Sequence, residues 1–519
     1  MQQPLVGSAP EYTLDDEEVP WVLGTQLTTR CGPLSRAPKG SRVLLVEAHD
    51  FARRKPYHHH KLTLLFAAMR QFRDRLEAAG YDVIYKQSDT FADVLREFFA
   101  EYPDTTLVAM RSPSHGSERR FREIVTTVGG TLRVVENELF ASTPAAFDEW
   151  ANGEGPFRHE QFYRFLRRES GVLMDDDEPI GGEWNYDDRN REVPPPSWDA
   201  PPIPEPEHYD LTRETAAWVA ETFDAWGDRG GFCWPVTRSQ AREHLDHFLE
   251  HRLPSFGPYQ DAMRADEWAM SHTLLSSAVN VGLLHPTAVI QAVENAYNSR
   301  DDVPLASAEG CIRQLLGWRE FVRHVYNHAM PDLATANQLD AHRPLPEFYW
   351  SGETDMNCLA ATLEGVRKRG YAHHIQRLMV LSNFATLWGV EPSELNEWFH
   401  ATFVDAYHWV TTPNVVEMGQ YGQGVFATKP YVSSGNYLEK MSDYCSQCQY
   451  DQTRAIGDGA CPFNALYWDF LDRNEEQLRS NHRMALMYGH LDDKRESGDR
   501  TKIRERVADL RESLQVGTL

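Results

Sequence analysis

A proline- and glycine-rich acidic stretch divides the chain into two parts with different residue patterns, and this division constrains the fold more than any other feature. Between residues 181 and 210 the sequence contains PPPSW and PPIPEPE. Such runs cannot form a helix or a central strand, so they predict an ordered or semi-rigid linker. With 519 residues, the chain also exceeds the size at which a single core stops growing. We therefore expect two domains joined by a long connection.

The part before the linker has the pattern of an α/β domain. From about residue 19 to residue 136, short β-branched runs alternate with helical stretches, which is typical of a parallel sheet with flanking helices. The clearest helix has an apolar stripe suited to packing on a sheet, made by Leu62, Leu65, Met69, Phe72 and Leu76. The expected strands cover residues 22–24, 43–47, 83–86, 107–110 and 132–135.

Helical patterns dominate the part after the linker, in segments such as TAAWVAETFDAW and SELNEWFHATFVDAYHWV. The sequence predicts an α/β domain over residues 1–150, a linker over 151–210 and an all-helical domain over 211–519. No apolar run approaches the roughly 18 residues that a membrane span needs. The N-terminus lacks the basic-then-apolar order of a secretion signal, so we expect a cytoplasmic protein without a membrane partner.

The charge balance is strongly acidic, with 77 acidic and 52 basic residues and a net charge of −25. An acidic surface repels DNA at long range. Binding of nucleic acid would therefore need a local arginine-rich groove, or high salt that screens the repulsion.

Four of the seven cysteines have the spacing of a metal site. Seven cysteines in so long a chain do not suggest a disulfide framework. A two-residue spacer lets two sulfurs of one turn face the same centre, and two further thiolates complete four ligands. The spacing alone does not choose between an iron–sulfur cluster and zinc. The candidate ligands are Cys358, Cys445, Cys448 and Cys461.

The helical part contains neither a GxGxxG turn nor a Walker loop, so a nucleotide cofactor would have to sit between helices. Hydroxyl groups in Ser271–Ser276 lie at an expected helix start, where free N–H groups favour phosphate. Polar and aromatic residues interrupt an apolar helix in Gln314–Glu320. Arg377 and Asp405 are charges in hydrophobic surroundings, where an unpaired charge is costly.

Each of these groups also has a purely structural interpretation. Ser271 would serve only as a helix cap, Arg319 and Glu320 would form a surface ion pair, and Asp405 would cap its own helix. Composition does not choose between the two interpretations.

Several segments, in this order, resemble the photolyase and cryptochrome superfamily, specifically its iron–sulfur bacterial and archaeal branch, which includes prokaryotic (6-4) photolyases. They are QLLGWREF, YAHHIQRLMVLSNF, WFHATFVDAYHWV, KPYVSSGNYLEKMSDYC and CPFNALYWDF. The resemblance runs from about Val22 to the C-terminal region and includes GGEWNYD of the linker. It implies an N-terminal antenna domain, a helical domain that binds FAD, and a [4Fe-4S] cluster on the four cysteines.

The resemblance also implies roles for single residues. Thr411 corresponds to the position that faces flavin N5, where relatives carry an amide or an acid, and this departure leaves the redox state of the flavin in the dark open. Trp350 and Trp398 correspond to aromatic residues through which electrons reach the flavin. The flavin-binding positions of the family correspond to Ser271, His272, Thr273, Leu274, Ser276, Gln314, Trp318, Arg319, Arg377 and Asp405.

The activity that the resemblance implies is light-driven repair of UV-damaged DNA by a monomer, in which reduced FAD donates an electron to a lesion flipped out of the duplex. His373 and His374 match the paired histidines of (6-4) photolyases, and His374 is the expected proton donor. Eukaryotic (6-4) enzymes carry a further histidine where this chain has Leu378, so proton transfer must rest on the pair or include water. We therefore expect (6-4) photoproducts as the lesion.

Two other function classes share some of these features. A cryptochrome-like blue-light receptor without repair activity has the same fold and cofactors, and the histidine pair favours repair over it. A cluster-containing helicase or nuclease would need a nucleotide loop or paired acidic metal ligands, and the sequence has neither.

The antenna site departs from the family pattern. Relatives that hold a ribityllumazine chromophore have an acid where this chain has Thr25, and another where Phe51 stands. Either a different antenna binds near Gln26 and Glu47, or none does.

Overall fold

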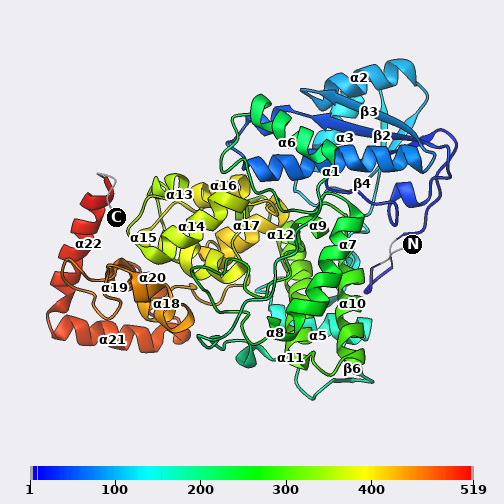
Figure 1. Cartoon of the computed structure of the whole chain (residues 1–519). Helices are drawn as coiled ribbons and strands as arrows, with labels where there is room; N and C mark the ends of the chain where they lie inside the picture. The colour runs from blue at the N-terminus through cyan, green and yellow to red at the C-terminus, as the bar shows by residue number, and fades with distance from the viewer. Residues whose placement is uncertain (1–3, 9, 153–154, 516–519) are drawn as a thin grey trace.

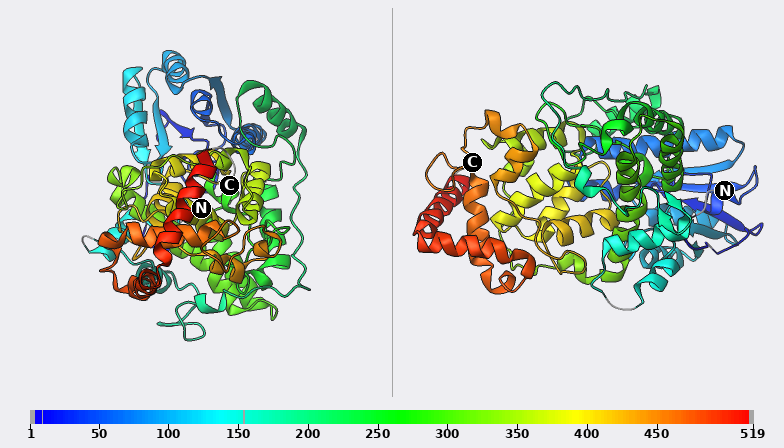
Figure 2. Two further views of the ribbon diagram at one scale, coloured as in Figure 1. Left: turned by 90° about the vertical axis from the view of Figure 1, so that its left-hand side faces the viewer. Right: turned by 90° about the horizontal axis from the view of Figure 1, so that it is seen from below.

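The computed structural model describes residues 4–8, 10–152 and 155–515. A sheet with its helices forms one side of the molecule, and a larger helical part extends from it to helices α21 and α22 at the C-terminal end (Figure 1). The right-hand view of Figure 2 shows the same division, with the C-terminal helices at the end of the molecule opposite the sheet. The predicted combination of an α/β layer and a larger helical part is confirmed.

The sheet has five parallel strands in the order β3-β2-β1-β4-β5. The central strand pairs with β4 through its first residues and with β2 through its last, where Trp21 lies opposite Leu44. The expected strand at residues 22–24 was therefore placed too late, because pairing starts at Glu18, in an acidic stretch that also contains Pro20. The strands are β1 (Glu18–Val22), β2 (Arg42–Ala48), β3 (Asp82–Ser88), β4 (Thr106–Met110) and β5 (Thr131–Val135).

Helices cover both faces of the sheet. The helix α1 (His59–Ala78) buries the predicted stripe, and the side chains of Leu62, Met69 and Leu76 are almost completely buried. The helix α6 (Asp210–Thr222) lies against α1, so the chain directly after the connector covers the sheet (Figure 1). The helices α2 (Phe91–Glu101) and α3 (Ser117–Thr127) contact each other and the strands β3, β2 and β5.

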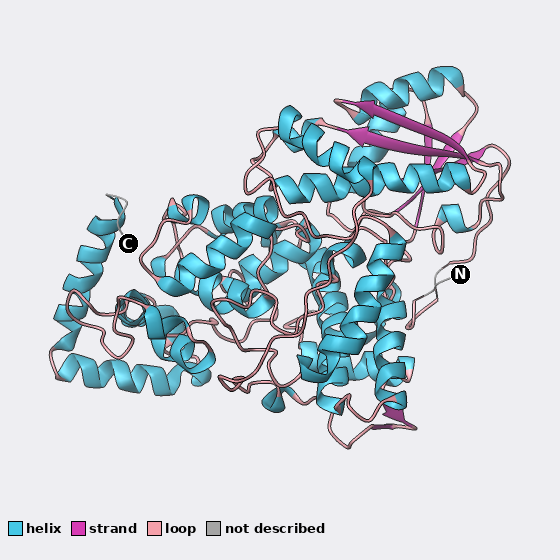
Figure 3. Ribbon diagram, in the orientation of Figure 1, coloured by secondary structure: helices cyan, strands magenta, loops and turns pink. Residues whose placement is uncertain are grey.

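In the rest of the described chain, the regular structure is helical apart from a small hairpin of β6 (Met174–Asp175) and β7 (Glu178–Pro179), seen near the edge of Figure 3. The stretch predicted as linker contains α5 (His159–Ser170), whereas residues 190–209 have no regular structure. The remaining α-helices are α4 (Pro144–Ala151), α7 (Arg238–His247), α8 (Leu253–Phe256), α9 (Ser276–Asn280), α10 (Pro286–Ser299), α11 (Leu305–Ile312), α12 (Glu320–Ala329), α13 (Phe348–Ser351), α14 (Asn357–Arg369), α15 (Asn383–Trp388), α16 (Pro392–Thr402), α17 (His408–Thr412), α18 (Gly435–Met441), α19 (Pro462–Arg473), α20 (Glu475–Leu478), α21 (Ala485–Glu496) and α22 (Asp499–Gln515).

The N-terminus of α1 joins the sheet layer to the helical part through three buried histidines. The ring nitrogens Nε2 of His58, His59 and His60 each donate to a carbonyl, at 3.0 Å in all three bonds. The acceptors belong to distant segments and are the carbonyls of Arg367, Ala216 and Gly230. Burial lowers the pKa of His58 to about 3 and that of His60 to about 4, so both rings are neutral at pH 7.

Lys61, one residue further along α1, reaches across the same boundary. Its Nζ donates to the carbonyls of His400 at 2.5 Å and Ala406 at 2.6 Å. Burial lowers the pKa of this lysine to about 7, although the nearby Asp405 opposes the shift. The helix α1, which belongs to the sheet layer, therefore holds the loop that carries Asp405 in place. Within the described ranges, no helix is both long and apolar enough to cross a membrane.

Candidate functional site

A cavity of about 1040 Å³ lies among the helices of the larger part. Its size reaches the upper end of the range for ligand pockets, which is about 300–1,000 Å³. The residues that the sequence placed in a flavin or lesion site and that line this cavity are His272, Thr273, Ser276, Gln314, Trp318, Arg319, His374, Arg377, Asp405 and Thr411. Ten side chains predicted from separate segments thus meet in one place.

Three π-helical segments form much of the cavity wall: Arg313–Arg319, Gln376–Ser382 and Pro413–Gly419. A π-helical turn widens the helix and is found mostly at functional sites. Each segment continues directly into an α-helix or follows one, so the wider turn changes which side chains face inward.

Arg377 and Asp405 form a two-pronged ion pair inside the cavity, with N–O distances of 3.0 Å for both prongs. The hydroxyl of Ser276 donates to the same carboxylate at 2.7 Å. Burial opposes ionisation of Asp405, but Arg377 and Ser276 lower its pKa below the ordinary value. The interpretation of Asp405 as a cap of its own helix is wrong, and the predicted need for a partner is met by Arg377.

Arg319 and Glu320 do not form a surface ion pair. Arg319 is enclosed between the rings of Phe140 and Trp409, at 4.9 and 4.7 Å from the ring centroids, and its Nη1 donates to Asn280. Glu320 points the other way and accepts hydrogen bonds from the backbone N–H groups of residues 141 and 142. Burial lowers the pKa of Arg319 to about 10, and its Nε has no hydrogen-bond partner in the part of the chain that the structure describes.

Gln314 and Trp318 lie on the same π-helical segment. Trp318 stacks on His159 with ring centroids 3.8 Å apart and planes inclined by 6°. Gln314 donates only a long bond, of 3.4 Å, to the carbonyl of Gly310. Both side chains are half-buried and face the cavity, so their polar or aromatic surfaces are available to a bound molecule.

The segment Ser271–Ser276 is not the start of a helix, because the helix α9 begins only at Ser276. The preceding residues form a turn, in which Leu274 has a φ of 55°. Ser271 and Leu274 are buried away from the cavity, and the Ser271 hydroxyl pairs with that of Ser255 at 2.7 Å. Of the hydroxyl groups in this segment, those of Thr273 and Ser276 therefore line the cavity.

The two adjacent histidines have different surroundings. His374 faces the cavity, and its enclosure by protein together with Arg377 lowers its pKa to about 4. His373 is buried behind it, with only 1% of its surface exposed, and stacks on His272 with ring centroids 4.6 Å apart. Neither ring nitrogen of His373 has a hydrogen-bond partner among the residues that the structure describes. Burial and the neighbouring His272 lower the pKa of His373 well below its ordinary value.

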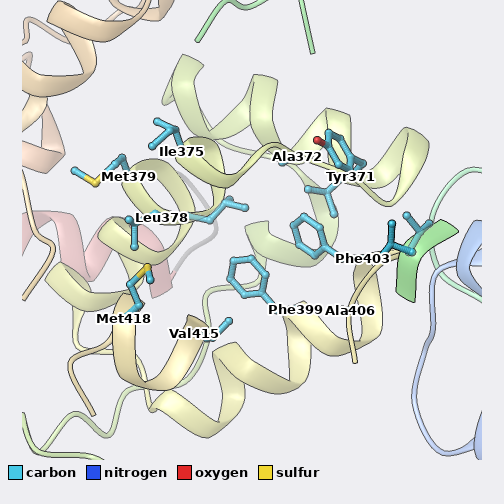
Figure 4. Close-up of a cluster of buried hydrophobic side chains, with 14 of the residues drawn as sticks. Tyr371, Ala372, Ile375, Leu378, Met379, Phe399, Phe403, Ala406, Val415 and Met418 are labelled. Carbon is cyan, nitrogen blue, oxygen red and sulfur yellow. The ribbon is translucent and has the colours of Figure 1, made fainter. Parts of the chain in front are cut away.

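Apolar side chains form one wall of the cavity, and Figure 4 shows them on neighbouring helices and on the loops between these helices. Those that line the cavity are Tyr371, Ile375, Leu378, Met379, Phe399, Ala406, Val415 and Met418. Leu378 follows Arg377 directly and belongs to this wall. A planar apolar ring would be sheltered from water here.

Trp398 and Trp350 lie outside the cavity. Trp398 is fully buried, packs edge-on against Phe399 at 5.1 Å, and donates its Nε1 to the Tyr349 carbonyl at 3.1 Å. Trp350 is half-buried and packs against Trp226 with ring centroids 5.9 Å apart. Since Phe399 lines the cavity, a row of aromatic rings begins at the cavity wall and continues into the protein.

The four candidate metal ligands meet in a second, much smaller cavity. Burial, and then the nearby Cys461, Cys448 and Cys445, raise the pKa of Cys358 well above its ordinary value. Buried thiols of this kind stay protonated unless a positive centre stabilises the thiolates. Among the residues that the structure describes, no three His, Cys, Asp or Glu side chains are grouped so as to hold a single metal ion.

Glycine leaves room at this second cavity. A Cβ atom at Gly435 would lie 3.1 Å from Cys461 Sγ and 3.3 Å from the Asn464 side chain. The Gly435 N–H donates to that same asparagine at 2.8 Å, which fixes the start of α18 beside the thiols.

The cavity contains functional groups that the sequence did not single out. Asn280 accepts from Arg319 and donates to the Asp405 carbonyl at 2.8 Å, so it links two predicted residues. Lys429 and Tyr431 line the cavity from the segment KPYVSS, whose residues carry no functional pattern apart from the family resemblance. Arg483 comes from the C-terminal region, and no local signal marks it.

The two residues expected beside an antenna are engaged with protein. Glu47 accepts from Arg70 at 2.7 and 3.0 Å and from the Tyr85 hydroxyl. Gln26 donates to the Met110 carbonyl at 3.1 Å. The antenna stays a prediction.

Comparisons with known proteins agree with this geometry. The model of the deoxyribodipyrimidine photo-lyase-related protein family matches residues 20–234. A (6-4) photolyase of Agrobacterium fabrum is 39% identical over 477 residues, which cover 90% of this chain and 94% of that protein.

Two solved structures share the fold. A bacterial class III photolyase from Agrobacterium tumefaciens superposes with a TM-score of 0.57 and 19% identity, over 81% of this chain and 82% of that one. A Synechocystis cryptochrome superposes with a TM-score of 0.55 and 14% identity, over 80% of this chain and 84% of that one. Sequence, fold and cavity agree, and the chain belongs to the photolyase and cryptochrome superfamily, in the group of photolyase-related proteins.

Proposed function

We propose that the protein is a DNA photolyase that repairs (6-4) photoproducts in UV-damaged DNA with light. The observation that carries this proposal is the position of His374, which opens into the same cavity as the Arg377–Asp405 pair. The 39% identity to a (6-4) photolyase over 90% of the chain supports it.

Family membership implies FAD, and the cavity residues fit such a group. Buried donors without partners, Arg319 Nε and Arg313 Nη2, suit the phosphates of a dinucleotide. The apolar wall around Leu378 and Phe399 suits a planar ring system. When bound and reduced, FAD supplies the photoexcited electron that starts repair.

The chain's own residues prepare the site for this chemistry. Arg377 is held by two bonds to Asp405, which is in turn fixed by Ser276 and by the Asn280 bond to its carbonyl. A guanidinium fixed in this way keeps its orientation and its charge at the cavity wall. The apolar wall excludes water, which strengthens every electrostatic interaction inside the cavity.

His374 is the residue that moves a proton. Its ring is exposed to the cavity, so a flipped-out base can reach it, and its lowered pKa of about 4 makes it a strong acid once it is protonated. His373, stacked on His272 behind it, has no contact with the cavity and positions His374 instead of touching the lesion. We place Thr411 at the flavin and Trp398 and Trp350 on the route by which electrons enter.

We also propose a [4Fe-4S] cluster on Cys358, Cys445, Cys448 and Cys461. The four side chains line one cavity but do not close on a single ion. A zinc ion with Zn–S bonds of 2.3 Å holds its sulfurs only about 3.8 Å apart. A cubane cluster needs more widely spaced thiolates, and it supplies the positive centre that deprotonates buried thiols.

Illumination of the reduced holoenzyme with DNA that contains either (6-4) photoproducts or cyclobutane dimers tests the function. We expect loss of the (6-4) lesion. His374→Ala should abolish this loss with FAD still bound, whereas His490→Ala, at an exposed position on α21, should leave it unchanged. Wild-type protein that repairs neither lesion would refute the proposal and favour a light receptor.

A further inference from the structure

A further hollow, separate from the small cavity at the four cysteines, adjoins the main cavity, and its position suggests what it binds. This hollow, here called the side groove, has a volume of about 570 Å³. Thr428 and Arg483 line both the side groove and the main cavity, so the two share a wall. The residues that line the side groove are Pro156, Arg158, Tyr421, Gly424, Ala427, Thr428, His482 and Arg483.

The shared wall is a rigid loop, because one buried carboxylate holds it. Glu417 is fully buried, and its Oε2 accepts the N–H groups of Gln423 and Gly424 at 2.9 and 3.0 Å. Its Oε1 accepts those of Phe426 and Ala427 at 3.0 and 3.1 Å. The loop therefore keeps its shape without help from a ligand.

Hydrogen bonds to this loop also anchor the opposite side of the groove. Phe157, next to Arg158, donates its N–H to the Val425 carbonyl at 3.0 Å, which ties the start of α5 to the loop. Asn481, next to His482, donates to the Thr428 carbonyl at 2.9 Å, and Arg483 donates to the Thr428 hydroxyl. Three segments far apart in the sequence thus meet at one fixed groove.

The charge of the side groove is opposite to that of the protein. Its described lining contains two arginines and a histidine but no acidic residue, although the whole chain has a net charge of −25. Arg158 has no acidic partner in the part of the chain that the structure describes. Lys429 and Lys440 line the main cavity, whose lining, unlike that of the side groove, also contains acidic residues such as Asp187 and Asp261. A local positive groove on an acidic protein attracts a polyanion to that place alone.

We propose that the side groove binds the phosphate backbone of the damaged strand beside the flipped-out nucleotide. This inference rests on the proposed function. Thr428 and Arg483 line both hollows, so a strand that places its lesion in the main cavity and continues across this shared wall brings its next phosphates to the guanidinium groups of Arg158 and Arg483. Contacts to phosphate fix register and carry no sequence information, so the groove positions the strand for any flanking sequence.

Binding in the dark tests the inference. The holoenzyme is titrated against a labelled duplex with one (6-4) photoproduct, by fluorescence anisotropy over a series of salt concentrations. The variants are Arg158→Gln and Arg483→Gln, with Arg158→Lys as the conservative change. Arg242→Gln on α7 is the matched control, because it removes the same charge from an exposed position outside both hollows.

We expect each glutamine variant to lower the slope of log affinity against log salt by about 1, since one phosphate contact is lost. The advantage of wild type over the variant should then shrink about fourfold for a fourfold rise in salt. Arg158→Lys should keep the wild-type slope. Arg242→Gln should repair the lesion in a single turnover at the wild-type rate, because Arg242 lies outside both hollows.

The outcomes separate the two proposals. Wild type that does not prefer damaged DNA would refute the proposed function. Wild type that prefers it, together with glutamine variants that behave like Arg242→Gln, would refute the side groove as a phosphate site. Arg483 is exposed, so its variant keeps the test decisive if Arg158→Gln does not fold.

Discussion

Glu417→Gln is the most direct test of how the wall between the two hollows is built. The wild-type carboxylate accepts four backbone N–H groups, two on each oxygen. An amide keeps one accepting oxygen and turns the other into a donor, so two of the four N–H groups lose their partner. Hydrogen bonds to a charged group contribute about 1.5–3 kcal/mol each, so the loop should lose about 3–6 kcal/mol.

Hydrogen exchange measures this loss where it occurs. Each 1.4 kcal/mol is a factor of ten. The amides of residues 423–427 should therefore exchange at least about 100-fold faster in Glu417→Gln. Glu439→Gln on α18 is the control, because its exposed carboxylate accepts only from the Gln452 side chain, at 2.6 Å. Exchange in Glu417→Gln within a factor of three of wild type would refute the view that this carboxylate holds the loop.

Three further predictions concern other parts of the molecule. Asp405→Asn removes the charge from the pair with Arg377, so flavin retained after gel filtration should fall at least tenfold, and full retention would contradict the role of the pair. Because the pKa values of His58 and His60, about 3 and 4, lie below the unfolded value of about 6.5, their neutral forms stabilise the fold fully above pH 6.5 and progressively less toward pH 4. The urea midpoint should therefore fall between pH 7 and pH 5, and His60→Gln should weaken that fall. Cys358→Ser should reduce iron and acid-labile sulfide below half of the wild-type content, and unchanged contents would exclude the cluster at these cysteines.

Periodicity was sufficient to predict the layers of this fold. The stripe from Leu62 to Leu76 and the β-branched runs report burial directly, because one face of each element must leave water. The start of β1 was missed because the strand begins among acidic residues and is held by pairing with β4, which no local pattern reveals.

The site was harder to predict than the fold, because π-helical segments change which side chains face the cavity. A pattern of 3.6 residues per turn places Gln314 and Trp318 on one face but turns Arg319 away from Gln314, whereas all three line the cavity on the wider turn. The two adjacent histidines show the same limit, since only the fold turns His374 inward and buries His373 against His272. Arg377 and Asp405 could each be recognised as charges in need of a partner, but their pairing depends on the tertiary structure.

The side groove is the other part of the site that the sequence could not predict. Arg158, Thr428 and Arg483 come from three separate regions, and none has a neighbour in sequence that suggests a common site. Such a site becomes visible only when the chain is folded.

The bonds that α1 makes across the molecule bear on how this protein could be recombined with its relatives. A fragment cut at the connector would leave the Lys61 ammonium without the carbonyls of His400 and Ala406, and the loop around Asp405 without its support. A chimera that exchanges only the sheet layer would therefore disturb the neighbourhood of the cavity even though every cavity residue is retained. Residues 400–406 would have to be transferred together with α1, so the unit of exchange is defined by these contacts and not by the proline-rich stretch that divides the sequence.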